Sequence, residues 1–109
     1  MSSENTIWKD SRATALAEVL TLIEDQVVMQ NFLRDVLTEK EIIEIGSRYK
    51  AAQMLAQGKT YASIVETTKL SSRTVARISE WLQSGTRGYD SAIKIQEQYH
   101  EHTQPAHAD

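Results

Sequence analysis

The sequence predicts an all-α protein, and three of its features support that prediction. The only proline, Pro105, lies near the C-terminus, so no proline interrupts residues 7–99. Apolar residues recur at spacings of three and four, and valine and isoleucine show no sustained alternation. The chain has no cysteine, which excludes disulfides and cysteine-based metal sites. Its 109 residues are enough for one small domain.

Two helices rich in aliphatic residues are expected near the N-terminus, after a frayed segment at residues 1–10. The first begins at about Ser11 and carries Leu16 and Leu20 on one stripe. The second begins after a cap at Asp25. Both helices have aliphatic residues on more than one face, which is more than a small monomer would bury. We therefore expect a partner subunit to cover the surplus.

A long helix is expected from Thr38 to about Gln57. Thr38 is followed three residues later by Glu41, which is the pattern of a capping box. Gly46 lies inside this helix, where glycine costs about 1 kcal/mol relative to alanine. It either allows another backbone to approach closely or is simply tolerated. Gly58 ends the helix as a C-terminal cap.

Two short helices joined by a tight turn are expected at residues 60–83. Thr60 can cap the first helix and Ser71 the second, because a hydroxyl accepts from an orphan backbone N–H. Lys69 occupies the turn position where glycine is common, and a left-handed backbone there costs about 1–2 kcal/mol. Leu70 is the apolar residue under the turn.

The second of these short helices has two contrasting faces. Val75, Ile78 and Leu82 recur at i, i+3 and i+7 and form a buried stripe. The other side is small, polar and cationic near its N-terminus, which is what the DNA major groove admits. We therefore interpret residues 60–83 as a helix-turn-helix that binds DNA. The outer face comprises Ser72, Arg73, Ala76 and Arg77.

Simple helix packing is the alternative interpretation, since any antiparallel helix pair has a buried stripe, a capped start and exposed arginines. The charge distribution favours DNA binding. The whole chain has a net charge of −3, but residues 46–88 hold seven basic and two acidic residues. A basic segment inside an acidic protein is typical of an element that contacts DNA.

The C-terminal part is expected to be a loop at residues 83–88, a last helix at residues 89–99 and a disordered polar tail at residues 100–109. Histidines in such a tail are solvated rather than metal ligands. The domain therefore spans residues 11–99. No catalytic triad, pair of buried carboxylates or phosphate-binding loop appears, so we expect no enzyme activity. No apolar run of about 18 residues and no signal peptide appear, so we expect a cytoplasmic protein.

Short motifs between residues 23 and 94 carry a resemblance to a known family. They are Leu37-Thr38, Gly46-x-Arg48, Gly58-Lys59-Thr60-Tyr61, Ser71-x-x-Thr74-Val75-x-Arg77 and Gly88-Tyr89. In these motifs the chain resembles the Trp-repressor superfamily, and most closely its YerC/YecD-type branch. The resemblance implies an all-helical, intertwined homodimer. It also implies that the second helix of the helix-turn-helix binds double-stranded operator DNA.

The resemblance also concerns a possible ligand pocket. In tryptophan-responsive members, two arginines hold the ligand, and they match Arg48 and Arg77 here. Thr38 matches a position that lines the pocket from the other subunit. The chain departs from the pattern where Ile78 replaces a glycine and Trp81 replaces a serine. These larger side chains would fill the pocket, with Trp81 as a plug, so we do not expect tryptophan as a corepressor. The arginines would then contact phosphates or form surface ion pairs.

Arg73 is the best candidate for reading a base, because it lies in the first turn and Arg–guanine pairs are the commonest specific contact. A phosphate contact is its alternative role. Ser72 and Ala76 would contact a thymine methyl or let the helix approach. The remaining candidate DNA contacts, several of them to the backbone, are Lys59, Thr60, Tyr61, Lys69, Ser71, Thr74, Arg77 and Arg87.

Three functions are consistent with these patterns. The leading one is a dimeric, sequence-specific DNA-binding transcriptional regulator, specifically a repressor. The second is a helical dimerisation module that binds protein and not DNA. The third is a repressor gated by a small ligand other than tryptophan. DNA binding and protein binding differ in their response to salt, because cations that bind DNA release counterions.

Overall fold

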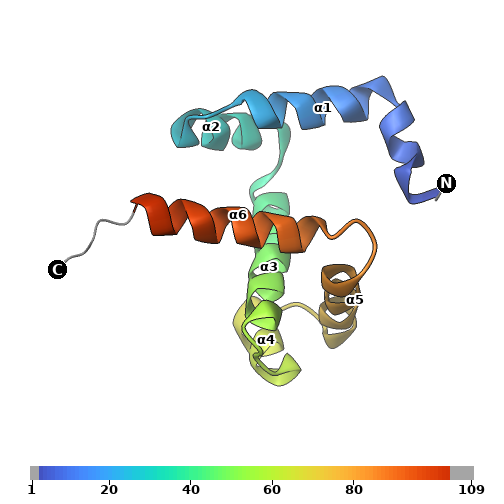
Figure 1. The fold of residues 1–109 in the computed structure, drawn as a ribbon, viewed down its shortest axis with the longest axis vertical. Helices are drawn as coiled ribbons and strands as arrows, with labels where there is room; N and C mark the ends of the chain where they lie inside the picture. Colours follow the sequence, from blue (N-terminus) through green and yellow to red (C-terminus); the bar gives the residue numbers. More distant parts are fainter. Residues whose placement is uncertain (1–2, 104–109) are drawn as a thin grey trace. The chain divides into compact units, whose positions relative to one another are not determined.

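The computed structural model describes residues 3–103, and every regular element in this range is helical, which confirms the predicted all-α class. Figure 1 shows the helices in chain order. The chain forms two compact units, Met1–Ile42 and Ile43–Asp109, and each is described separately below. The elements are η1 (Ser3–Lys9), α1 (Ser11–Leu22), α2 (Gln26–Val36), α3 (Glu39–Ala56), α4 (Tyr61–Thr68), α5 (Ser72–Gln83) and α6 (Gly88–Thr103).

The first unit contains η1, α1 and α2. Asp25 caps α2 as predicted, and its Oδ2 accepts a hydrogen bond from the Val28 N–H at 3.0 Å. The sequence also predicts a frayed segment at residues 1–10, but the structure has a 3-10 helix over Ser3–Lys9 that contacts α1. Asp10 ends this helix and caps the next, because its carboxylate accepts from the Arg12 N–H at 2.8 Å.

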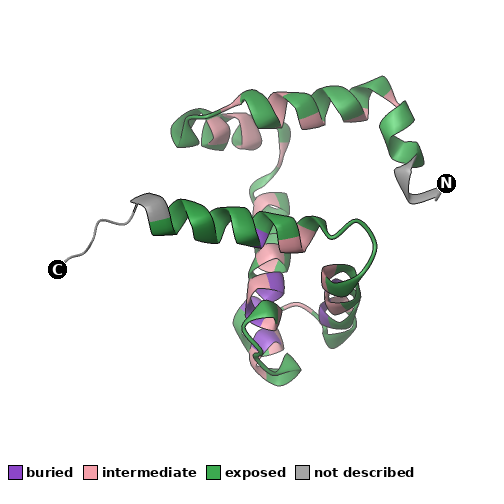
Figure 2. Ribbon diagram, viewed as in Figure 1, coloured by how far each residue is buried: buried purple, intermediate pink, exposed green. Residues whose placement is uncertain are grey.

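No residue between Thr6 and Ile42 is buried (Figure 2). This is unusual for helices with so many aliphatic residues, since such helices normally bury an apolar stripe. The most exposed large side chains of α1 and α2 are Leu22 at 69%, Val27 at 60% and Val36 at 53%. The first unit therefore has the expected aliphatic surplus, and its residues from Thr6 to Ile42 form no buried core.

The long helix α3 leads into the second unit and begins with the predicted capping box. The Thr38 N–H donates to Glu41 Oε1 at 2.9 Å, and the Glu41 N–H donates to Thr38 Oγ1 at 3.1 Å. At the other end, Gly58 has a φ of +82°, a conformation that side chains rarely adopt. The Lys59 N–H then donates to the Met54 carbonyl at 3.0 Å and closes the cap.

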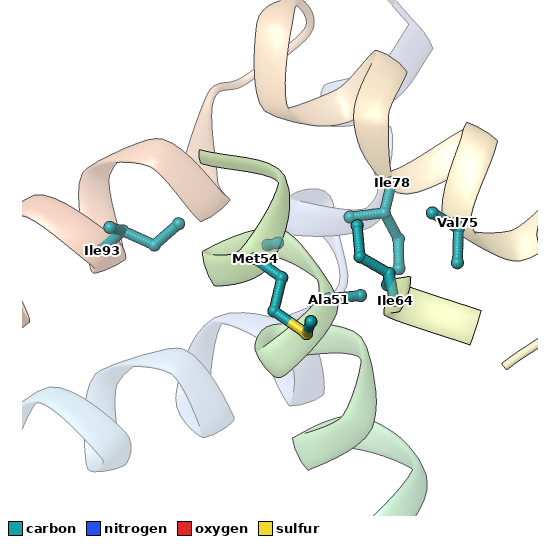
Figure 3. Packing of buried hydrophobic residues seen from close by; sticks show 7 residues of the cluster. Ala51, Met54, Ile64, Val75, Ile78 and Ile93 are labelled. Atoms are coloured by element: carbon teal, nitrogen blue, oxygen red, sulfur yellow. The ribbon is translucent and has the colours of Figure 1, made fainter. Parts of the chain in front are cut away.

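The core of the second unit forms where α4, α5 and α6 pack on the C-terminal half of α3. The predicted stripe on α5 is confirmed, since Val75 and Ile78 are buried and Leu82 packs against the same cluster. Figure 3 shows Ile78 and Val75 beside Ile64 of α4. Two of the α3 residues in this cluster are alanines, and both are fully buried. The cluster comprises Ala51, Ala52, Met54, Ile64, Val75, Ile78 and Ile93.

The turn between α4 and α5 is built around Thr68, whose residue exposure is only 8%. Its Oγ1 donates to the Ile64 carbonyl at 2.8 Å and accepts from the Leu70 N–H at 3.3 Å. Lys69 has a φ of 63°, so the predicted left-handed position is confirmed. One hydroxyl thus hydrogen-bonds a backbone carbonyl of α4 and a backbone N–H that follows in the turn.

The last helix differs from the prediction at its C-terminal end. It continues to Thr103 instead of ending at Tyr99, so the disordered tail predicted from residue 100 begins too early. The helix can continue because no glycine or proline follows Gly88 until Pro105, and a proline disfavours helix in the residue before it. The rest of the predicted tail, residues 104–109, lies outside the described residues.

We predict that Thr68→Val destabilises the fold. Valine keeps the shape of threonine but removes the hydroxyl, which leaves the partly buried Leu70 N–H without its partner. The expected loss is about 1–3 kcal/mol of the free energy of unfolding, measured by urea denaturation. Thr67→Val is the matched control, because Thr67 is the exposed neighbour in the same helix. Equal midpoints for the two variants would show that the Thr68 hydroxyl does not hold the turn.

Candidate nucleic-acid interface

Both short helices begin with the hydroxyl caps that the sequence predicts. Thr60 Oγ1 accepts from the Ser63 N–H at 3.1 Å at the start of α4. Ser71 Oγ accepts from the Thr74 N–H at 3.1 Å at the start of α5, and it also bonds the Thr74 hydroxyl at 3.0 Å. These caps fix where each helix begins and hence which residues occupy its first turn.

The outer face of α5 lies opposite its buried stripe, as predicted. Val75 and Ile78 are 0% and 1% exposed, whereas the four residues predicted on the other side are all exposed. Arg73 lies in the first turn and Arg77 one turn later, so the two guanidinium groups follow one another along this face. The four residues are Ser72, Arg73, Ala76 and Arg77.

Ion pairing separates the candidate cations into two groups. Arg48 pairs with Glu44 at 3.0 Å, and Arg87 pairs with Asp90 at 2.9 Å. The other candidate cations form no ion pair within residues 3–103, so their charge is available to a ligand. They are Lys59, Lys69, Arg73 and Arg77.

Arg87 has a structural role that the sequence did not reveal. Its φ of 63° makes it the second non-glycine residue in a left-handed conformation among the described residues. Asp90 receives both Arg87 and Lys94, the latter at 3.2 Å. The hydrogen bond from Lys94, followed by that from Arg87, holds the pKa of Asp90 below its ordinary value. Arg87 therefore helps to fix the conformation of the loop between α5 and α6 through its left-handed backbone and its ion pair with Asp90.

The candidate ligand-pocket residues come from both units, and each is described within its own unit. Ile78 belongs to the core, where a glycine would leave a cavity. Trp81 is 48% exposed in one chain. It lies three residues after Ile78 and one turn after Arg77, which places it at the edge of the buried stripe of α5. Thr38 caps α3 in the first unit.

A polar link between α3 and α6 was not predicted. Tyr49 Oη donates to Gln96 Oε1 at 2.8 Å, and Gln53 Nε2 donates to the same oxygen at 3.1 Å. Tyr49 and Gln53 lie one turn apart on α3, a spacing that places them on one face. That spacing is the only signal in the sequence, because the partner is more than 40 residues away. The link fixes α6 against the helix on which the helix-turn-helix rests.

No helix within the described residues is long and apolar enough to cross a membrane. Residues 3–103 also contain no group of three His, Cys, Asp or Glu side chains placed to hold a metal ion.

Two capped short helices joined by a left-handed turn and packed on a long helix define a helix-turn-helix protein. The family model described as Trp repressor protein matches residues 11–97, and the chain belongs to that family. This confirms the resemblance inferred from the short motifs.

Relatives of known sequence or structure agree with this assignment. The uncharacterized protein YerC of Bacillus subtilis (strain 168) is 34% identical over 62 residues, which cover 57% of this chain and 60% of that protein. The crystal structure of a TrpR-like protein from Eubacterium eligens ATCC 27750 has a TM-score of 0.79 and 29% identity, over 85% of this chain and 96% of that one. A putative Trp repressor from Staphylococcus aureus has a TM-score of 0.79 and 25% identity, over 88% and 96%.

Proposed function

We propose that this protein is a sequence-specific DNA-binding transcriptional regulator, specifically a repressor, that acts as a homodimer on double-stranded operator DNA. The observation that carries the proposal is the outer face of α5. It presents Arg73 and Arg77 exposed and without an ion pair to any residue in the range 3–103, next to the small side chains of Ser72 and Ala76. Membership of the Trp repressor family supports the same function.

In this proposal α5 enters the major groove with its N-terminal turn foremost. The small side chains of Ser72 and Ala76 let the helix approach the base edges. Arg73 donates to a base, with guanine O6 and N7 as the matching acceptors. Arg77 lies further from the N-terminus and donates to a phosphate, which adds affinity without sequence preference.

The start of α4 and the turn supply further contacts with the DNA backbone. Lys59 and Lys69 are exposed cations without ion pairs in the described chain, and Tyr61 is 43% exposed. Thr60 Oγ1 already accepts from the Ser63 N–H, and the N–H groups before it have no partner within the helix α4. Together these groups would position the protein on phosphates.

Dimerisation follows from the exposed apolar surface. The first unit has no buried residue between Thr6 and Ile42, so its helices need another surface to cover them. A second copy of the chain is the occupant that the family suggests. It would also give two recognition helices related by twofold symmetry, which suits an operator with two half-sites.

The protein-interaction module remains the second candidate, and the net charge of −3 favours it. Salt dependence separates the two candidates. A protein that neutralises several phosphates loses affinity steeply as salt rises, whereas an apolar protein interface does not.

Arg73→Ala and Arg77→Ala should weaken DNA binding in different ways. Loss of Arg73 should cost about 1–3 kcal/mol at the selected site and relax the preference at one base pair. Loss of Arg77 should weaken all sequences alike and reduce the salt slope by about one unit. The measurement is a titration against duplexes selected from random DNA and against scrambled duplexes, over a range of salt.

Arg12→Ala is the matched control for both variants, because Arg12 lies in the first unit and pairs with Asp10 at 2.7 Å. Urea denaturation should show that none of the three substitutions unfolds the protein, since exposed changes usually stay within about 0.5 kcal/mol. If Arg73→Ala leaves both the DNA affinity and the base preference unchanged, the protein-interaction module becomes the favoured function over the DNA-binding regulator.

The chain should be a dimer at micromolar concentration, and Val28→Asp should convert it to a monomer. Val28 is 51% exposed on α2. An aspartate in the first turn of a helix is favoured by the helix dipole, so the change disfavours the apolar interface and not the helix itself. Multi-angle light scattering measures the result. Gln30→Asp, on an exposed position of the same helix, is the control and should stay dimeric. A monomeric wild type would exclude the proposed dimer.

Tryptophan should not alter the affinity for DNA. Ile78 fills the core position beside α3, so an indole ligand would have to displace a buried side chain. Isothermal calorimetry should show no saturable heat with tryptophan. DNA titrations with and without the amino acid should coincide. Stoichiometric binding of tryptophan would instead assign it the corepressor role.

A further inference from the structure

The start of α6 holds a charge network that the proposed function does not use. It lies at the end of the loop at residues 84–87, which follows the helix-turn-helix directly (Figure 1). Asp90 Oδ2 accepts from Arg87 Nη2 at 2.9 Å and lies 3.2 Å from Lys94 Nζ. Two cations therefore share one carboxylate oxygen, which distinguishes this network from an isolated surface pair.

The position of Arg87 is fixed by its backbone as well as by its side chain. Its φ of 63° is left-handed, a conformation that costs free energy in a residue other than glycine. Its carbonyl accepts from the Ser91 N–H at 3.0 Å, so Arg87 directly precedes the first turn of α6 as its N-cap. Asp90 lies in that first turn. The backbone and the ion pair together hold the guanidinium group beside Asp90.

Exposure distinguishes the carboxylate from its two cationic partners. The side chain of Asp90 is 25% exposed, whereas those of Arg87 and Lys94 are 51% and 67% exposed. The hydrogen bond from Lys94, followed by that from Arg87, lowers the pKa of Asp90, so the carboxylate is ionised at neutral pH. Arg87 is thus exposed enough to meet a phosphate, but its side chain is already engaged.

We propose that Asp90 withholds Arg87 from DNA and thereby limits the binding of the protein to DNA of any sequence. A carboxylate and a phosphate compete for the same planar donors of an arginine. Arg87 comes only four residues after Gln83, the last residue of α5, so a freed guanidinium would add a phosphate contact close to the proposed recognition helix. Such a contact adds affinity without sequence preference. Withholding it leaves the base contact of Arg73 a larger share of the binding.

Lys94 makes the hold on Arg87 reversible. It contacts the same carboxylate oxygen, so Asp90 keeps a cationic partner when Arg87 leaves. An exposed ion pair changes an equilibrium by at most about fivefold, so Asp90 tunes the affinity and does not abolish it. This inference rests on the proposed DNA-binding function, whereas the hold of Asp90 on Arg87 can be measured without DNA.

Asp90→Asn tests the proposal, because asparagine keeps the shape of the side chain and removes its charge. The full-length protein is titrated with mixed-sequence double-stranded DNA over a range of salt. Its affinity at low salt should rise about threefold to tenfold, from the lost ion pair and one added phosphate contact. The dependence of log affinity on log salt should become steeper by about one unit.

Glu97→Gln is the matched control for net charge. It removes one negative charge from the same helix, where Glu97 is exposed and forms no ion pair with any residue in the range 3–103. Its salt slope should equal that of the wild type. Equal changes of affinity and slope in the two variants would show that only net charge matters, and would overturn the proposal.

Arg87→Ala identifies the cation that is released. In the Asp90→Asn background it should remove the gain in affinity and restore the wild-type salt slope. In the wild-type background it should cost less, because Asp90 already engages the guanidinium group. An equal loss in both backgrounds would overturn the proposal. A purely structural Asp90, which favours the N-terminus of α6 through the helix dipole, would lower the urea midpoint when replaced and leave DNA affinity unchanged.

The hold itself is measured by NMR of the Arg87 side-chain N–H groups without DNA. Rotation of the guanidinium group should be slow in the wild type and fast in Asp90→Asn. Fast rotation in the wild type would overturn the proposal even if the protein binds DNA. Slow rotation in a protein that binds no DNA in either form would instead refute the proposed function and leave the ion pair with a structural role alone.

Discussion

Close packing of α3 against the helix-turn-helix is the interaction on which the rest of the second unit depends. Ala51 and Ala52 are fully buried, and they meet the largest buried side chains of the core, Ile64, Val75 and Ile78. Small residues on one helix and branched residues on the others allow these side chains to pack together in the core. This contact orients α5, so the direction of Arg73 and Arg77 is a consequence of alanines that never touch a ligand.

The first unit differs from the second in that its helices are well formed but bury no side chain from Thr6 to Ile42. Its helices are well capped at Asp10 and Asp25, yet packing within the unit buries none of the residues from Thr6 to Ile42. Local capping contributes only about 0.5–2 kcal/mol per helix, which does not hold a short helix in water without burial. Folding of this unit is therefore coupled to whatever covers its aliphatic side chains, and in the proposed dimer that partner is a second copy of the chain.

The sequence predicted the features that depend on neighbours within one helical turn. The caps at Thr60 and Ser71 and the capping box at Thr38 each join residues three positions apart. Residue type and spacing were therefore enough to identify them. The left-handed Lys69 followed from the shortness of the turn. The exposure of Arg73 followed from the period of the buried stripe on α5.

Features that depend on distant residues were missed. The polar link from Tyr49 to Gln96 spans 47 positions, and the left-handed Arg87 is accompanied by an ion pair with Asp90. The interpretation of Trp81 as a plug of the ligand pocket stays a prediction, because that pocket would include Thr38 of a second chain. The roles of Arg73 and Arg77 at DNA remain predictions, since periodicity establishes exposure and not the partner.

The division between paired and unpaired cations explains how an acidic protein could bind DNA selectively. Arg48, Arg87 and Lys94 each have a carboxylate partner outside the recognition surface, so their charge adds little attraction for phosphates. The unpaired arginines lie on one face of α5, where a duplex can meet them only in one orientation. In the proposed function, a net charge of −3 would repel DNA from the rest of the molecule and keep nonspecific binding weak. Affinity would then depend on the contacts of the helix-turn-helix, and a wrong base that removes one of them would cost a larger share of the binding free energy.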